Sequence, residues 1–150
     1  MGTSEILRQV KEGTMSLKEA ENLLNMGNYE DMGYAKLDTS RKERTGFAEV
    51  VFCSGKADQH LLAIFDRIYE KEGEVFGTRA SKEQYKLVAD RFPQVVYDPI
   101  SRILKIEKEG KLRTGKVAVC TAGTADIPVA EEAAQTAEFF GTDVERIYDV

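Results

Sequence analysis

The fold is decided by residues 49–78, which read EVVFCSGKADQHLLAIFDRIYEKEGEVFGT. The apolar, β-branched run at 49–53 predicts a buried strand, and residues 74–78 predict a second one. The segment between them predicts a helix that ends at Gly73, because its apolar residues recur at helical spacing: Leu61, Leu62, Phe65, Ile68 and Tyr69. A strand, a helix and a strand in this order favour parallel pairing through a right-handed crossover.

The same alternation continues along the chain. Ser81 predicts the start of a second helix that ends before Pro93, and residues 95–97 predict a third strand. Residues 98–99 mark a turn, after which residues 103–106 alternate like an edge strand. We therefore predict an α/β fold with a small, mostly parallel sheet of the three-layer type, built from a βαβαβ arrangement and a hairpin strand.

The chain opens on a predicted helical hairpin, with helices at about residues 4–12 and 16–26. Ser16 and Glu19 have the spacing of a capping box. Residues 31–46 show little periodicity. Their charge cluster, Arg41-Lys42-Glu43-Arg44, is as compatible with a solvated connection as with a function.

Residues 107–116 are rich in charge and glycine, which is typical of a linker. We expect an N-terminal α/β domain at 1–114, including the helical leader, and the start of a second domain at 115–150. The second domain begins with a strand, a helix and a strand. A single βαβ unit cannot bury both faces of a parallel sheet. Its strands therefore either join the preceding sheet or begin a larger domain that has been cut off.

Composition excludes several classes of protein. The chain has 150 residues, 21 Lys and Arg against 26 Asp and Glu, and a net charge of −5. The acidic balance argues against a dedicated nucleic-acid binder, and no apolar run approaches the roughly 20 residues of a membrane span. Cys53 and Cys120 form neither a disulfide framework nor a zinc set, and both are expected to be buried at strand ends. We expect a cytoplasmic protein.

The loop of small residues at 121–126, TAGTAD, has the setting of a ligand site. It leaves the carboxyl end of a predicted strand and enters a helix, where free amides and the helix dipole favour an anion. It matches neither the dinucleotide fingerprint nor a P-loop. A tight turn with Asp126 as the helix cap is an equally good interpretation.

Longer stretches resemble the LarB family. They are VAVCTAGTADIPVAEEAA at 117–134, VERIYDV at 144–150, RTGFAEVV at 44–51 and SGK at 54–56. The resemblance covers essentially the whole chain. It implies an N-terminal domain followed by a PurE-like domain of the flavodoxin or Rossmann type. It also implies an enzyme, a transferase or carboxylase-hydrolase. This enzyme carboxylates nicotinic acid adenine dinucleotide at C5 of the pyridinium ring and cleaves the phosphoanhydride. The products are pyridinium-3,5-biscarboxylate mononucleotide and AMP, on the route to the nickel-pincer cofactor.

The resemblance also implies roles for single residues. The loop of PurE-like domains holds the substrate phosphate and ribose, which places Gly123, Thr124 and Ala125 at the phosphate and Asp126 near ribose hydroxyls. Thr121 is counted with them as a substrate-binding residue. Ala125 stands where the family often has Ser, so an amide contact is expected there and a hydroxyl contact is not. The catalytic Cys of the family is expected beyond Val150, so this chain is expected to be a fragment without full activity.

A second phosphate site is predicted in the N-terminal domain. If the strands at 49–53 and 74–78 are parallel, both following loops leave the same sheet edge near two helix N-termini. The residues of this prediction are Ser54, Gly55, Lys56, Arg79, Arg41 and Arg44. Solvated charges at loop ends are the alternative. His60 lacks a partner at metal-ligand spacing, and Glu131 and Glu132 point about 100° apart on a helix, so neither is expected to form a site.

Two other functions stay open: a PurE-type aminoimidazole ribonucleotide carboxylase, and a non-catalytic module for substrate binding or assembly. No bound cofactor or protein-held metal is predicted. Carbon dioxide or bicarbonate is the expected co-substrate, with Mg2+ as a candidate ion, and the full-length protein is expected to be a homo-oligomer. The expected partner is the nucleotide substrate, with no nucleic acid and no membrane.

Overall fold

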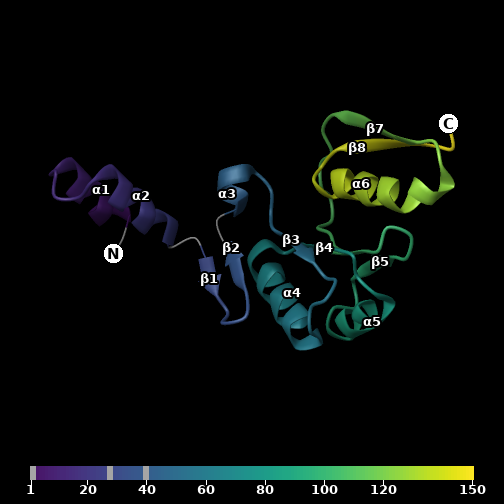
Figure 1. Ribbon diagram of the computed structural model, residues 1–150, viewed down its shortest axis with the longest axis horizontal. Helices are drawn as coiled ribbons and strands as arrows, with labels where there is room; N and C mark the ends of the chain where they lie inside the picture. The colour runs from purple at the N-terminus through teal and green to yellow at the C-terminus, as the bar shows by residue number, and fades with distance from the viewer. Residues whose placement is uncertain (1–2, 27–28, 39–40) are drawn as a thin grey trace. The chain divides into compact units, whose positions relative to one another are not determined.

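A computed structural model describes residues 3–26, 29–38 and 41–150. The chain divides into two compact units, residues 1–49 and 50–150. Figure 1 labels the helices and strands of both. Within the described ranges, no helix combines the length and the apolar character needed to cross a bilayer.

The first unit begins with the predicted helical hairpin, α1 (Thr3–Lys11) and α2 (Leu17–Met26). Among residues 3–24 of the hairpin, Ile6 and Ala20 are buried. The predicted capping box is confirmed: the Glu19 amide donates to Ser16 Oγ (3.2 Å), and the Ser16 amide donates to Glu19 Oε2 (2.9 Å). The strands β1 (Tyr29–Asp31) and β2 (Lys36–Asp38) pair antiparallel, and α3 (Arg41–Thr45) follows. β2 and α3 lie within residues 31–46, the segment that shows little periodicity, and β1 ends at its first residue.

The second unit holds a four-stranded sheet in the order β3-β4-β6-β5. Its strands are β3 (Val50–Phe52), β4 (Val75–Thr78), β5 (Val96–Asp98) and β6 (Ile103–Ile106). β3 and β4 are parallel, and β6 is antiparallel to both β4 and β5. β3, β4 and β5 therefore point the same way, which confirms the α/β class.

The position of β6 corrects one prediction. The alternating residues 103–106 were expected at an edge, but the strand lies inside the sheet and β5 takes the edge. The cause is burial on both faces, because Ile103 and Leu104 are 1% and 0% exposed whereas Val96 of β5 is 57% exposed. A strand with apolar residues on both faces is stable only where both faces are covered.

Helices lie on both faces of this sheet. α4 (Asp58–Glu72) and α5 (Lys82–Arg91) pack together below it in Figure 1, and α6 (Ile127–Phe139) lies above it. Below the sheet, Phe65 of α4 and Cys53 after β3 come so close that a Cβ added at Gly77 would lie 3.1 Å from Phe65 Cζ and 2.8 Å from Cys53 Sγ. Above the sheet Phe76 of β4 contacts Phe139, with ring centroids 4.7 Å apart.

α6 also packs against a two-stranded sheet in the same unit. β7 (Lys116–Thr121) and β8 (Asp143–Tyr148) pair parallel and join no strand of the four-stranded sheet. α6 connects β7 to β8 and packs on both, and its Phe139 contacts Phe76 of the four-stranded sheet, so a single helix lies between two sheets. The predicted boundary at residues 114 and 115 stays a prediction.

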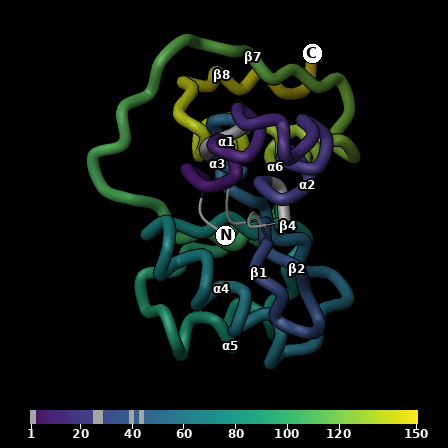
Figure 2. Tube along the Cα trace, turned by 90° about the vertical axis from the view of Figure 1, so that its left-hand side faces the viewer, coloured from purple at the N-terminus to yellow at the C-terminus, as the bar shows by residue number. Residues whose placement is uncertain are grey.

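The predicted linker, residues 107–116, runs along one side of the second unit in Figure 2, and Lys111 near its middle binds two other parts of the unit. Lys111 Nζ lies 2.6 Å from Glu74 Oε2, at the start of β4, and also donates to the Phe139 carbonyl at the end of α6. The Thr114 amide donates to the Gly141 carbonyl (2.7 Å). One lysine thus joins the linker to both the four-stranded sheet and α6.

Candidate functional site

The loop after β7 leads into α6 without a side-chain cap on the backbone amides of the turn. β7 ends at Thr121, residues Thr124–Asp126 form a 3-10 turn (η1), and α6 begins at Ile127. The Asp126 amide donates to the Gly123 carbonyl (3.0 Å), and the Thr121 hydroxyl donates to the same carbonyl (3.3 Å). Thr124, Ala125 and Asp126 are exposed, whereas Thr121 is buried. The five predicted loop residues therefore form one turn at a strand end.

Asp126 does not close the helix with its side chain. It stands at the N-cap of α6 in a helical backbone conformation and makes no side-chain capping hydrogen bond. A Cβ added at Gly123 would lie 3.6 Å from Asp126 Oδ2, so the carboxylate lies over the glycine. The predicted tight turn with Asp126 at the helix N-cap is therefore confirmed in position, but the Asp126 side chain makes no capping hydrogen bond. The amides of the turn lack a side-chain acceptor, which suits an anion, and the carboxylate suits hydroxyl donors.

The end of β8 completes this edge. Thr121 and Tyr148 are register partners, and the Asp149 and Val150 amides both donate to the Thr121 carbonyl, at 2.8 and 3.3 Å. Asp149 has a positive φ of 63°. Asp tolerates this conformation better than most residues. Its exposed side chain adds a second carboxylate beside the loop.

The second predicted site is only partly assembled. β3 and β4 are parallel, as predicted, so residues 54–56 and Arg79 follow the same edge, and the Cys53 amide donates to the Thr78 carbonyl (2.9 Å). Gly55 has a φ of 75° and the Lys56 amide donates to the Cys53 carbonyl (3.1 Å), which closes a tight turn. The Ala57 N-cap of α4 makes no side-chain capping bond, so Ser54, Gly55 and Lys56 lie before an uncapped helix.

Arg79 is directed elsewhere. Its guanidinium lies 3.1 Å from Glu132 Oε2 of α6, and its backbone has a positive φ of 56°. The N-terminus of α5 beside it is closed by the capping box of Ser81 and Gln84. Gln84 Nε2 also donates to the Cys53 carbonyl (2.8 Å). An anion at this edge would have to draw Arg79 away from Glu132.

The other two predicted arginines are not placed at this edge. Arg41 lies in α3, in the first unit. The side chain of Arg44 lies outside the described residues. Their joining the second phosphate site stays a prediction.

Comparison with known proteins identifies the family. Residues 29–108, more than half of the chain, match the family model described as the LarB/PurE-like N-terminal domain. The chain belongs to this family. It is also 33% identical over 158 positions to an uncharacterized protein of Methanocaldococcus jannaschii, across 97% of this chain and 60% of the relative. The chain thus spans about three fifths of the length of that curated relative.

The LarB/PurE-like N-terminal domain comprises β1 to β6 with α3 to α5, since the match ends just after Ile106. The turn at 54–56 lies inside the matched range. The helical hairpin and the loop at 121–126 lie outside it. The two predicted phosphate sites therefore belong to different parts of the chain.

The two cysteines differ. Cys53 is fully buried, as predicted, and burial raises the pKa of its thiol to about 12 against the opposing effect of the Lys56 ammonium. Cys120 is exposed, so the prediction that it is buried is wrong. Its register partner is Ile147, 37% exposed, while the neighbouring pair Thr121 and Tyr148 faces α6. The strand end was predicted correctly, but only one face of this sheet is covered.

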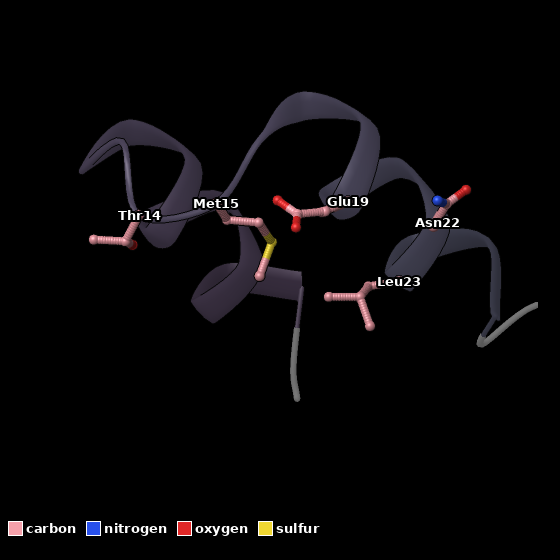
Figure 3. A pocket seen from close by; sticks show the side chains of 5 residues that line it. All are labelled: Thr14, Met15, Glu19, Asn22 and Leu23. Carbon is pink, nitrogen blue, oxygen red and sulfur yellow. The ribbon is translucent and has the colours of Figure 1, made fainter.

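A hollow of about 350 Å³ lies on the helical hairpin, far in sequence from both loops. Figure 3 shows the side chains that line it: Thr14, Met15, Glu19, Asn22 and Leu23. Hydrogen bonds from the Ser16 hydroxyl and amide lower the pKa of Glu19. The charged group of the hollow is therefore already committed to the capping box.

The structure also separates the two glutamates that were not expected to share a site. Glu132 pairs with Arg79, whereas Glu131 accepts from Arg146 Nε (2.8 Å) and from the Tyr148 hydroxyl (3.0 Å). Arg146 also binds Glu138 (2.6 and 2.9 Å). Sequence reasoning missed this cluster. Its signal is the spacing of seven residues between Glu131 and Glu138, two helical turns, followed by an arginine in the next strand.

Within the described residues, no three His, Cys, Asp or Glu side chains gather as metal ligands. The candidate Mg2+ ion stays a prediction, because such an ion is usually held by one or two carboxylates together with the substrate phosphates and needs no cluster of three.

Proposed function

We propose that this chain is part of an enzyme that carboxylates the pyridinium ring of nicotinic acid adenine dinucleotide and cleaves its phosphoanhydride, releasing AMP. The family match supports the relation to LarB- and PurE-type carboxylases. The observation that carries the proposal is the uncapped turn at 123–126, between a parallel strand and the start of α6. Ligands of open α/β folds bind at this edge.

In this proposal the loop holds the mononucleotide half of the substrate. The amides of Gly123, Thr124 and Ala125 donate to the phosphate, and the helix dipole adds a favourable field. Gly123 lets the phosphate approach the backbone closely because it has no side chain. The Asp126 carboxylate repels a phosphate and accepts hydrogen bonds from ribose hydroxyls, which fixes the orientation of the nucleotide.

The turn at 54–56 holds the AMP half or the pyrophosphate. Lys56 supplies the cation and the uncapped start of α4 supplies amides. Arg79 joins them only after leaving Glu132, so its contribution to binding is reduced by the cost of breaking that pair. Lys56 is accordingly the leading residue of this second site.

Neither cysteine of this chain is proposed as the nucleophile that adds to the pyridinium ring. The Cys53 thiol is fully buried and its pKa is about 12, so thiolate is scarce at neutral pH. Cys120 lies on the face of β7 opposite α6. We expect no carboxylated product when this chain alone is incubated with the dinucleotide and bicarbonate, and product would refute this assignment.

Calorimetric titration distinguishes this proposal from its alternatives. We expect nicotinic acid adenine dinucleotide to bind at least tenfold more tightly than aminoimidazole ribonucleotide, because the dinucleotide engages two phosphate turns. The reverse order would favour a PurE-type purine carboxylase. Binding of neither compound would favour a non-catalytic assembly module.

A further inference from the structure

A chain of hydrogen bonds connects the turn between β5 and β6 to helix α6. Asp98 Oδ2 accepts from the Ser101 amide (2.9 Å), from the Ser101 hydroxyl (2.5 Å) and from Gln135 Nε2 (2.8 Å). Ser101 is 3% exposed. The turn is thus closed by Asp98 and then tied to the helix through one amide group.

The chain continues from Gln135 to β8. Gln135 Nε2 lies 3.4 Å from Glu131 Oε2, one turn earlier in α6. Glu131 in turn accepts from Arg146 and from Tyr148, whose register partner is Thr121. The connected side chains lead from β5, an edge strand of the four-stranded sheet, through α6 to β8, the strand beside the loop at 121–126.

Gln135 is the residue of this network that joins Asp98 to Glu131. Its amide stands between two carboxylates, those of Asp98 and Glu131, and supplies a donor to each. Burial opposes ionisation of Asp98, but hydrogen bonds from Ser101, the Ile100 amide and Gln135 outweigh it and hold its pKa below the usual range. Without the Gln135 amide, Asp98 keeps its donors in the turn and Glu131 keeps Arg146 and Tyr148, but the hydrogen-bonded link between the two carboxylates is lost.

The network also connects two parts of the chain. Asp98 and Ser101 lie within the matched LarB/PurE-like N-terminal domain, and Gln135 lies outside it. Glu131 stands near the start of α6, directly after the turn at 124–126. Because i→i−4 hydrogen bonds tie each turn of an α-helix to the one before it, holding residues 131 and 135 restrains the start of α6 and the turn that leads into it.

We propose that Gln135 is a positioning residue that couples the β5–β6 turn to the loop at 121–126. Its importance for substrate binding rests on the proposed function of that loop. The coupling itself does not, because it concerns only how the N-terminal domain fixes α6.

Amide hydrogen exchange tests the coupling without any ligand. In Gln135→Leu we expect the Asp126 amide to exchange at least fivefold faster, with the exchange of Phe76 and Leu104 in the sheet unchanged. Asp98→Asn combined with Gln135→Leu is expected to equal Gln135→Leu alone within twofold, because both changes break one path. Ala133→Ser, on the exposed side of α6, is the control. Unchanged exchange at Asp126, or equal acceleration in the sheet, would overturn the proposal.

A titration with inorganic phosphate tests the coupling in the opposite direction. In the wild type we expect the amides of residues 123–126 to shift together with those of Ile100 and Ser101, which donate to Asp98. In Gln135→Leu the loop amides are expected to shift alone. Shifts confined to the loop in the wild type would refute the coupling. If no loop amide shifts, the proposed function of the loop fails, and the exchange experiment still decides the coupling.

Discussion

Phe76 of β4 lies against Phe139 of α6, with ring centroids 4.7 Å apart and both side chains 1% exposed. Phe76 belongs to the matched LarB/PurE-like N-terminal domain, whereas Phe139 lies outside the match. This contact is the apolar centre of the packing of α6 on the four-stranded sheet. The helix that begins at the candidate phosphate loop is therefore anchored at its other end by the N-terminal domain.

Truncating Phe139 is expected to destabilise the fold strongly. We expect Phe139→Ala to lower the free energy of unfolding by about 3–5 kcal/mol, the range for truncating a buried aromatic residue. Denaturant titration measures the change. Phe140→Ala is the matched control, because Phe140 is only half-buried, and it is expected to cost less. Equal losses at both positions would contradict the central place of Phe139.

The two cysteines are expected to react at very different rates. At pH 8 a thiol reagent should label Cys120 within minutes, while Cys53 stays unlabelled until the protein unfolds, because burial raises the pKa of Cys53 to about 12. Mass spectrometry of the folded protein locates the label. Cys120→Ser should remove the fast reaction, and rapid labelling of Cys53 would contradict the packing around β3.

A methyl group at Gly123 should block the loop without unfolding the chain. Gly123 has an ordinary negative φ, and an added Cβ makes an ordinary 3.6 Å contact with Asp126. We expect Gly123→Ala to weaken binding of the dinucleotide at least tenfold in calorimetry and to leave the melting temperature within about 2 °C, since a substitution at a partly exposed position that creates no clash changes stability little. Ala122→Ser is the control that should bind normally. Tight binding by Gly123→Ala would exclude close approach of a phosphate at this turn.

The pair of Arg146 and Glu138 predicts a dependence of stability on pH. Hydrogen bonds from Arg146 lower the pKa of Glu138, although burial acts against them. A carboxyl with a lowered pKa in the folded state stabilises the fold above its unfolded pKa of about 4.3, and this stability is lost as pH falls through the folded pKa. As pH falls from 5 to 3, the advantage of the wild type over Glu138→Gln in free energy of unfolding should shrink by on the order of a few tenths to 1 kcal/mol. Denaturant titration at several pH values measures the free energy of unfolding of both proteins. A difference between them that does not change with pH would refute the prediction.

Sequence patterns predicted the long elements well. The strand, helix and strand from residue 49 to 78 follow from apolar spacing and from Gly73, which has a φ of 67° at the end of α4. The hairpin at 29–38 escaped notice because three-residue strands are too short for a period to be visible. The place of β6 depends on which strand is covered on both faces, and local sequence alone does not determine that.

The candidate site was predictable to the extent that it is contiguous. Thr121 to Asp126 are neighbours in the sequence, so their joint position at a strand end follows from the strand and helix around them. The pairing of Arg79 with Glu132 joins residues far apart in the chain and was missed. The Gln135 network was missed for the same reason, since Asp98 reaches α6 only through the tertiary fold.

The most direct test of the central claim is a map of amide shifts when nicotinic acid adenine dinucleotide is added to the labelled chain. The account predicts that the amides of Gly123, Thr124 and Ala125 shift most, with a second group at residues 54–58. It predicts that AMP alone shifts only the second group. If the dinucleotide leaves the amides at 121–126 unmoved while binding is saturated, the loop does not hold the nucleotide and the account is wrong.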